Sequence, residues 1–381
     1  MKISFCPKQM HSKFSIAAAV APKRSPRASL MCIRVEATTD GVFLHATDME
    51  NSIRIRVPGV EVDRPGNCLL QPQRFMSILK EVTDPKIKLT VDESKFVATV
   101  AGDRSRFKLV GSDPAEFPAF APATGEAYLS LSAATFQQLI DRTEYAAASG
   151  ENSRLALGGI LLEHASGVLH AVGTDGKRLA TAHGPCDSVN DHGEFISSRS
   201  TIVPVEAARL MARAIASTSD AKVKLVADPN AVTVSDEHVA VRARLLEGRF
   251  PRWRDVMPDF GDDATAIKVN LSAGSFVSTL RQAAIATSEE SRGVEFDFRD
   301  GTLSMSAETA EVGQSQVEMP IAYDGPGVKT TLDHSLVSQF FKAVPGDASV
   351  DMQVSGDGKS PALLVLDDTY RYVVMPMSKD K

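Results

Sequence analysis

The sequence predicts an α+β fold of three tandem units, each with two helices packed on antiparallel sheets. Two observations predict it. A strand-like alternation followed by a helical pattern occurs twice in each third of the chain, and short alternating strands with turn residues fill the intervals. Each helix presents one apolar face, which needs a sheet to cover it. The units are expected at residues 1–122, 123–262 and 263–381.

The first strand–helix pattern opens each unit. Its three copies lie at residues 3–21, 128–148 and 267–287, and each has an alternating start followed by apolar residues at helical spacing. In the second copy, Phe136 and Ile140 fall one turn apart on the same face. The repetition itself is the evidence, because self-similarity at a fixed spacing indicates an architecture built from copies of one unit.

A second strand–helix pattern lies in the middle of each unit, at residues 69–82, 201–215 and 329–344. Pro72 and Pro204 fall where the first two of these helices should begin, a position where a missing N–H costs nothing. The sequence therefore predicts two helices in each unit. Three tandem binding modules that do not close on one another remain an alternative interpretation.

Composition describes an ordinary globular chain. It has 381 residues, of which 43% are hydrophobic and 24% charged, and no apolar run approaches the roughly 18 residues that a membrane span needs. The net charge of −6 argues against a conventional DNA-binding protein. The four cysteines are far apart and form no CxxC pair, so neither a zinc knuckle nor a disulfide framework is indicated, and a reducing cytoplasm is expected. They are Cys6, Cys32, Cys68 and Cys186.

The charges before Glu36 are all basic, which makes a targeting peptide an alternative for the start of the chain. His11 and Lys13 interrupt any long apolar stretch, however, and Pro22 follows the small residues where cleavage would occur. We therefore expect this segment to belong to the fold.

The sequence offers no convincing catalytic centre. Residues 356–360 read GDGKS, but a phosphate-binding loop would need a glycine at Gln353, so a hairpin turn is the better interpretation. Residues 186–194 include a cysteine, a histidine and carboxylates, yet their Ser, Asn and Gly neighbours indicate a solvated loop rather than a metal site. We expect no metal and no cofactor. A nucleotide-dependent enzyme built on the GDGKS segment is the alternative from another class.

Several segments resemble the β subunit of bacterial DNA polymerase III, the sliding clamp family. They are ATDMENSI (46–53), GDRSRFKL (102–109), TDGKRLA (174–180), LLEGRFPRWRDVMP (245–258), RGVEF (292–296) and YVVMPM (372–377). The resemblance covers essentially the whole chain in order. It implies a head-to-tail homodimer that forms a six-domain ring around duplex DNA and tethers the replicative polymerase without catalysis. It also implies as partners the polymerase α subunit, the clamp loader, and other polymerases and repair proteins.

The resemblance further implies a hydrophobic partner cleft that takes short linear motifs. The matching positions are Leu157, Thr174, Gly176, Lys177, Arg178, Leu179, Pro251, Val256, Val373, Val374, Met375, Pro376 and Met377. Methionine and branched aliphatic side chains make an adaptable apolar surface, which suits several partners. Three positions depart from the common family pattern, namely Asp255, Leu336 and Ser378.

If the chain encircles DNA, its contacts should be phosphate-directed Lys and Arg side chains on the helices, without base readout. The candidates on the helices are Lys8, Lys13, Arg74, Lys80, Arg142, Arg209, Arg213, Arg281 and Lys342, and the resemblance to the family adds the loop pair Lys23 and Arg24. Val205 and Glu206 stand where family members often carry a basic pair, which puts the contribution of that helix start in doubt. The expected dimer interface joins Arg106, Phe107 and Leu109 on an edge strand to the region of Ile285.

Overall fold

The fold was analysed in a computed structural model, which describes residues 1–121, 123, 126–150, 156–215, 221–260 and 266–377. The chain forms two compact units. Unit 1 contains Met1–Gln137 and Cys186–Leu245, and unit 2 contains Gln138–Pro185 and Leu246–Lys381. The middle third of the sequence thus contributes to both. The predicted boundary residues 122 and 262 lie outside the described residues.

Unit 1 contains a small antiparallel sheet in which β9 is an edge strand. Its order is β5 (Glu61–Arg64), β1 (Lys2–Phe5), β7 (Ile87–Asp92), β8 (Val97–Ala101) and β9 (Arg106–Val110). Buried and exposed residues alternate along β7, so one face of this sheet covers the core.

The larger sheet of unit 1 combines strands from two of the predicted repeats. Val239 of β18 pairs with Ile55 of β4, which makes one continuous sheet from strands far apart in sequence. The order is β14 (Asp187–Val189), β10 (Tyr128–Ser132), β16 (Lys222–Ala227), β17 (Ala231–Ser235), β18 (Val239–Arg244), β4 (Asn51–Val57), β3 (Gly41–Thr47), β2 (Ile33–Thr38) and β6 (Gly66–Leu70).

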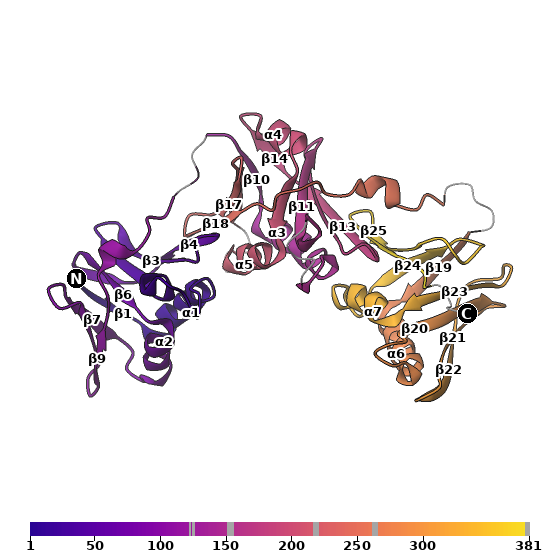
Figure 1. Ribbon diagram of the computed structural model, residues 1–381, viewed down its shortest axis with the longest axis horizontal. Helices are drawn as coiled ribbons and strands as arrows, with labels where there is room; N and C mark the ends of the chain where they lie inside the picture. The colour runs from indigo at the N-terminus through magenta and orange to yellow at the C-terminus, as the bar shows by residue number, and fades with distance from the viewer. Residues whose placement is uncertain (122, 124–125, 151–155, 216–220, 261–265, 378–381) are drawn as a thin grey trace. The chain divides into compact units, whose positions relative to one another are not determined.

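Helices α1 (Pro7–Ala18) and α2 (Pro72–Glu81) lie side by side in unit 1 (Figure 1). Both begin at a proline, and Phe14 of α1 meets Phe75 of α2 with ring centroids 4.9 Å apart. Because α1 buries such residues, the basic N-terminal segment is part of the fold, as predicted. Strand β15 (Thr201–Pro204) leads into helix α5 (Val205–Ile215), which confirms the other strand–helix pattern of this unit.

The prediction of a solvated loop over residues 186–194 was wrong. The segment forms β14 and the start of helix α4 (His192–Ser198), and Cys186 and His192 are only 4% and 6% exposed. His192 Nε2 accepts a hydrogen bond of 2.8 Å from the backbone N–H of Ala227, and burial lowers the pKa of its imidazole. Tertiary burial overrides the turn-like composition here. Within the described ranges, no group of three or more His, Cys, Asp or Glu could hold a metal ion.

Unit 2 contains two antiparallel sheets. In the larger one, β11 (Gly159–Ala165), β12 (Val168–Thr174), β13 (Arg178–Pro185), β26 (Tyr370–Val374), β25 (Ala362–Asp367), β24 (Ser349–Val354) and β19 (Ile267–Ser272) follow one another. The smaller has the order β22 (Gly313–Pro320), β21 (Thr302–Thr309), β20 (Gly293–Arg299) and β23 (Val328–Asp333). The pairing of β13 with β26 joins strands of the second and third predicted repeats.

Helices α6 (Ala273–Ala283) and α7 (His334–Lys342) pack together in unit 2 through Phe276 and Phe341, whose ring centroids are 4.8 Å apart. Asp333 caps α7 by accepting a hydrogen bond of 2.8 Å from the N–H of Ser335. Helix α3 (Ala133–Asp141) runs from one unit into the other in sequence. Each predicted strand–helix pattern is therefore confirmed in position.

The GDGKS segment is the connection between β24 and β25, as predicted for a hairpin turn. Gly358 has a φ of +63°, and a Cβ there would overlap the carbonyl oxygen of Lys329, so only glycine fits. Asp357 accepts a hydrogen bond of 2.8 Å from the N–H of Lys359, which fixes the turn. In the part of the chain that the structure describes, no helix is long and apolar enough to cross a membrane.

Candidate partner and DNA interfaces

The turn between β12 and β13 closes on itself through the TDG residues. Thr174 Oγ1 donates a hydrogen bond of 2.6 Å to the carbonyl of Arg178, and Asp175 Oδ1 accepts from the N–H of Lys177 at 2.9 Å. Gly176 has a φ of +88°, which favours glycine. The turn is thus held by its own side chains and presents Gly176 and Lys177 to solvent.

Arg178 ties this turn to two other elements. Its side chain is only 8% exposed, and its Nε donates to Asp175 Oδ2 at 3.0 Å. Its Nη1 donates to Gln339 of α7 at 2.7 Å, and its Nη2 donates to the carbonyl of Tyr145. A buried charge is stable only with such hydrogen-bond partners. Arg178 therefore links the turn to α7 and to the backbone at Tyr145.

The predicted C-terminal positions are brought beside this turn by the pairing of β13 with β26. Leu179 pairs with Val373, and the N–H of Met375 donates to the carbonyl of Lys177 at 2.9 Å. The Met377 N–H donates to the carbonyl of Thr331 at 2.8 Å, so the chain after β26 continues along β23.

Burial separates the predicted partner residues into two groups. Val373 and Val374 are buried and act as ordinary core residues of the sheet. Met375, Met377 and Val256 are instead 41%, 38% and 44% exposed. Large apolar side chains with this exposure are available to a partner, whereas the two buried valines are not.

The remaining predicted residues come from other segments. Leu157 is half-buried, and its carbonyl accepts from the N–H of Ala148 at 2.8 Å. Pro251 precedes the 3-10 helix η6 (Trp253–Val256), and Val256 is its last residue. Of the departures, Asp255 is exposed, the carbonyl of Leu336 accepts from the Tyr372 hydroxyl at 2.9 Å, and Ser378 lies outside the described residues.

A polar cluster that sequence reasoning missed holds η6 in place. Arg254 Nη1 reaches both carboxylate oxygens of Glu163, at 2.9 and 3.0 Å. The His170 ring lies 5.9 Å from the indole of Trp253 and 5.1 Å from the ring of His183. Burial, followed by the charge on His183, lowers the pKa of His170 to about 4. No motif in the sequence places these residues together, because they come from β11, β12, β13 and the segment after β18.

Nine of the eleven predicted DNA-facing cations have exposed side chains. They are Lys8, Lys23, Arg24, Arg74, Lys80, Arg209, Arg213, Arg281 and Lys342. Lys13 is half-buried. In α5, Arg209 Nη1 donates to Glu206 Oε1 at 2.7 Å, so the departure at Glu206 neutralises a cation one turn away.

Arg142 differs from the other predicted cations. Its side chain is 11% exposed, and its guanidinium group contacts Thr369, Asp367 and Tyr370. A phosphate contact would require these bonds to break, so we remove Arg142 from the set of DNA-facing residues.

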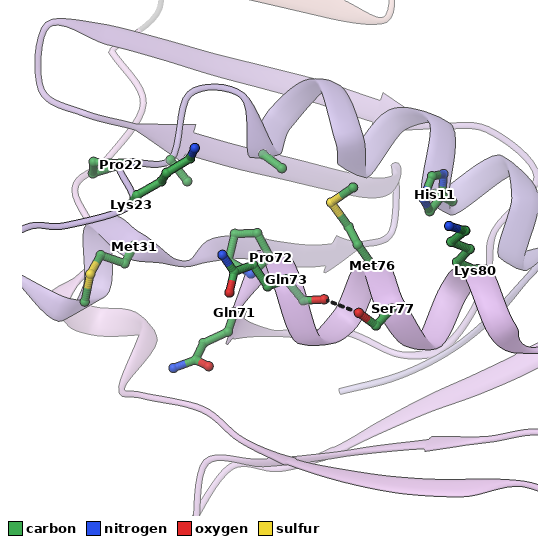
Figure 2. A pocket seen from close by; sticks show the side chains of 12 residues that line it. His11, Pro22, Lys23, Met31, Gln71, Pro72, Gln73, Met76, Ser77 and Lys80 are labelled. Atoms are coloured by element: carbon green, nitrogen blue, oxygen red, sulfur yellow. Dashed lines mark hydrogen bonds between the residues drawn. The ribbon is translucent and has the colours of Figure 1, made fainter.

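A cavity of about 580 Å³ is lined by α1, the segment after it and α2 (Figure 2). Lys23 lies toward one end of it, His11 and Lys80 toward the other, and Met76 between them. Its described lining contains no carboxylate. The surface around the two lysines therefore has a locally positive field despite the acidic total charge.

Two edge strands, β9 and β22, have exposed apolar residues on them or next to them. Strand β9 is the edge of its sheet, and its Val110 is 79% exposed. Of the predicted interface residues on β9, Arg106 and Phe107 are exposed and Leu109 is half-buried. In unit 2, β22 is an edge strand, Val312 beside it is 53% exposed, and Ile285 in the 3-10 helix η7 (Ala284–Ala286) is 73% exposed. Sequence reasoning missed Val110, Val312 and β22.

Comparisons with known proteins agree along the chain. Residues 1–121 match the family model of the DNA polymerase III beta subunit N-terminal domain, and residues 130–252 match that of its central domain. A beta sliding clamp from Chlamydia muridarum is 26% identical, covering 94% of this chain and 93% of that one. A beta sliding clamp from Pseudomonas aeruginosa is 28% identical and covers 88% of each.

Solved structures show the same fold. A sliding clamp from Pseudomonas aeruginosa bound to griselimycin superposes with a TM-score of 0.88 at 25% identity, covering 99% of both chains. The Bacillus subtilis sliding clamp gives a TM-score of 0.88 at 18% identity over the full length of both chains. The chain belongs to the family of bacterial DNA polymerase III β subunits, the sliding clamps, which are processivity factors of that polymerase and not themselves catalytic.

Proposed function

We propose that two copies of the chain assemble head to tail into a closed ring around duplex DNA. The observation that carries this proposal is the pair of edge strands, β9 and β22, with exposed Val110, Ile285 and Val312 beside them. An unpaired edge is a template for another strand, and an apolar residue on it favours a partner. Pairing β9 of one copy with β22 of the other removes both edges, and repetition of this contact closes the ring.

The ring holds DNA by topology rather than by tight binding. The cations on α1, α2, α5, α6 and α7 contact phosphates and read no bases. A net charge of −6 keeps the total attraction weak, and weak contacts let the ring slide. Because its DNA is chromosomal, the ring acts in the cytoplasm.

The partner cleft binds a short linear motif carried by the replicative polymerase α subunit, the clamp loader, and other polymerases and repair proteins. Met375, Met377 and Val256 supply its exposed apolar surface, and the TDG turn supplies a rigid wall. The griselimycin-bound relative supports a ligand site in this family.

Retention on circular and linear DNA tests the ring. Protein placed by the clamp loader of the same cell on nicked circular DNA should remain there at salt that abolishes phosphate contacts. Linearising the DNA should release it, because the ring slides off the ends. Equal retention on both forms would contradict the ring and favour an open adaptor. Calorimetry with ATP should show no binding, and measurable affinity would instead favour the nucleotide-dependent alternative.

A further inference from the structure

Arg142 directly follows α3, and its guanidinium group is fixed by the turn between β25 and β26. Its Nη1 donates to Thr369 Oγ1 at 2.9 Å, its Nη2 lies 3.5 Å from Asp367 Oδ2, and its Cζ lies 4.9 Å from the ring centroid of Tyr370. Arg142 thus holds an ion pair, a hydrogen bond and a cation–π contact, while its side chain is 11% exposed.

The turn that Arg142 contacts leads directly into β26. This strand carries Val373 and Val374, two of the predicted partner residues. Asp367 Oδ1 accepts from the N–H and the hydroxyl of Thr369, at 2.7 and 2.6 Å. The carbonyl of Thr369 also accepts from the N–H of His183 in β13 at 2.9 Å. The position of this turn therefore fixes the residue at which β26 begins to pair with β13. Met375 directly follows β26, so its position depends on the same pairing.

Two tyrosines connect Arg142 to the back of the TDG turn. The hydroxyls of Tyr370 and Tyr145 are 2.8 Å apart, and the Tyr145 ring centroid lies 5.6 Å from Arg178 Cζ. Burial raises the pKa of both phenols, so they stay neutral. Arg142 and Arg178 therefore contact opposite ends of one tyrosine pair, and the second of these arginines is itself a predicted partner residue.

We propose that Arg142 is a positioning residue of the partner cleft, which it supports from behind through Tyr370, Tyr145 and Arg178. This inference rests on the proposed function of the cleft. Arg142 touches no partner itself. It fixes the start of β26 and the tyrosine pair, so that Arg178 and Met375 are already in place when a peptide arrives, and pre-organisation of this kind strengthens binding.

Arg142→Met is the direct test, because methionine keeps a long apolar stem and removes the charge. A fluorescein-labelled peptide of the C-terminal segment of the polymerase α subunit serves as probe in fluorescence anisotropy. We expect its affinity to fall about three- to tenfold, mainly through faster dissociation. Arg142→Lys, which keeps the cation, should recover part of the loss. Tyr370→Phe, which removes one hydroxyl and keeps the ring, should give an intermediate loss even if Arg142→Met folds poorly.

Arg371→Met is the matched control. Arg371 lies on β26 next to Tyr370, is exposed, and pairs across the strand with Thr181. Arg371→Met also removes one arginine charge, here from β26 itself, yet it should bind the peptide as the unmodified chain does. In Arg142→Met, hydrogen exchange should quicken at the Tyr372–Met375 amides and stay unchanged in β19, a readout that a general loss of stability would not give.

The outcomes distinguish a failure of the positioning role of Arg142 from a failure of peptide binding by the proposed cleft. If the unmodified chain does not bind the peptide, the proposed cleft itself is wrong. If it binds and Arg142→Met binds equally well, Arg142 has no positioning role. If Arg142→Met keeps its peptide affinity but loses salt-dependent binding to a short linear duplex, the residue faces DNA after all, and the inference is overturned.

Discussion

The indole Nε1 of Trp253 donates a hydrogen bond of 3.2 Å to the Glu163 carboxylate, which also accepts a hydrogen bond from Arg254. This contact anchors η6, whose last residue, Val256, is exposed and belongs to the proposed partner cleft. Trp253 is the only tryptophan of the sequence, and the His170 ring is its neighbour at 5.9 Å. A single fluorophore therefore reports on the segment that borders the cleft.

The His170 site should make unit 2 less stable in mild acid. Its pKa is about 4 in the folded chain against an ordinary 6.5, so between these values the unfolded chain binds a proton that the folded chain does not. The stability due to neutral His170 is complete above pH 6.5 and declines as the pH falls toward 4. Allowing for solvent screening of this half-buried group, the decline is on the order of 1–2 kcal/mol.

Urea unfolding followed by Trp253 fluorescence at pH 7 and pH 5 measures this decline. His170→Gln should flatten the pH dependence, whereas His238→Gln, an exposed histidine in unit 1, should leave it as it was. An identical pH dependence in His170→Gln would show that other groups cause it.

Met375→Ala should weaken peptide binding by about 1–2 kcal/mol through lost apolar contact. The starting affinity is on the order of micromolar, since immobilising a short peptide offsets much of the gain from about two buried apolar side chains. Anisotropy with the labelled polymerase peptide measures the change. Met49→Ala, at another exposed methionine (57% exposed), is the control. Unchanged affinity in Met375→Ala would place the cleft elsewhere.

Asp255→Arg should change peptide affinity less than Met375→Ala does. Asp255 is exposed and directly precedes Val256 of the proposed cleft, and an exposed charge is largely screened by water and salt. The same anisotropy assay at two salt concentrations checks this. A salt-dependent change larger than that in Met375→Ala would mean that Asp255 lies against the bound motif.

Ile285→Asp should convert the dimer to monomers. Ile285 is 73% exposed in the single chain, and an aspartate there would leave an unpaired charge in the contact at a cost of several kcal/mol. Sedimentation velocity at low concentration reads the result. Met49→Asp introduces the same charge at an exposed apolar site on the turn between β3 and β4 and should stay dimeric. A dimeric Ile285→Asp would reject this interface.

Glu206→Gln should strengthen the contact of α5 with DNA. Glu206 now pairs with Arg209 at 2.7 Å, and its neutralisation removes that ion pair, so more of the positive charge of Arg209 acts on a phosphate. One added contact steepens the dependence of log affinity on log salt by about 0.9. Titration of a short linear duplex at several salt concentrations measures the slope. An unchanged slope would indicate that α5 does not approach the DNA.

Local patterns predicted the helices well and long-range contacts poorly. Apolar spacing and a proline at the start were enough to place α1 and α2, because both signals act within a few residues. Arg142 looked like one more cation on a helical face. Its partner Thr369 lies 227 residues further on, and no local pattern carries that information.

The candidate site divides in the same way. The family resemblance predicted a partner role for Arg178 and Met375, and the structure shows the first buried and the second exposed. The family resemblance did not predict the side chains that hold Arg178 and β26 in place. These are Tyr145, Gln339 and Tyr370, which belong to no recognisable motif. The turn-rich composition near His192 was misleading for the opposite reason, since burial by distant strands overrode a local preference for a loop.

The strand pairings between repeats limit how such a chain can be rearranged by recombination. Val239 pairs with Ile55 across one junction, and Leu179 pairs with Val373 across the other. A gene fragment encoding only residues 123–262 would yield a product in which β18 and β13 each have one unpaired edge, and unpaired edges of largely buried strands invite self-association. A single repeat is therefore not a unit that recombination can move alone. Duplication or exchange of one repeat succeeds only when its neighbours bring matching strand edges, so the three repeats are bound to evolve together.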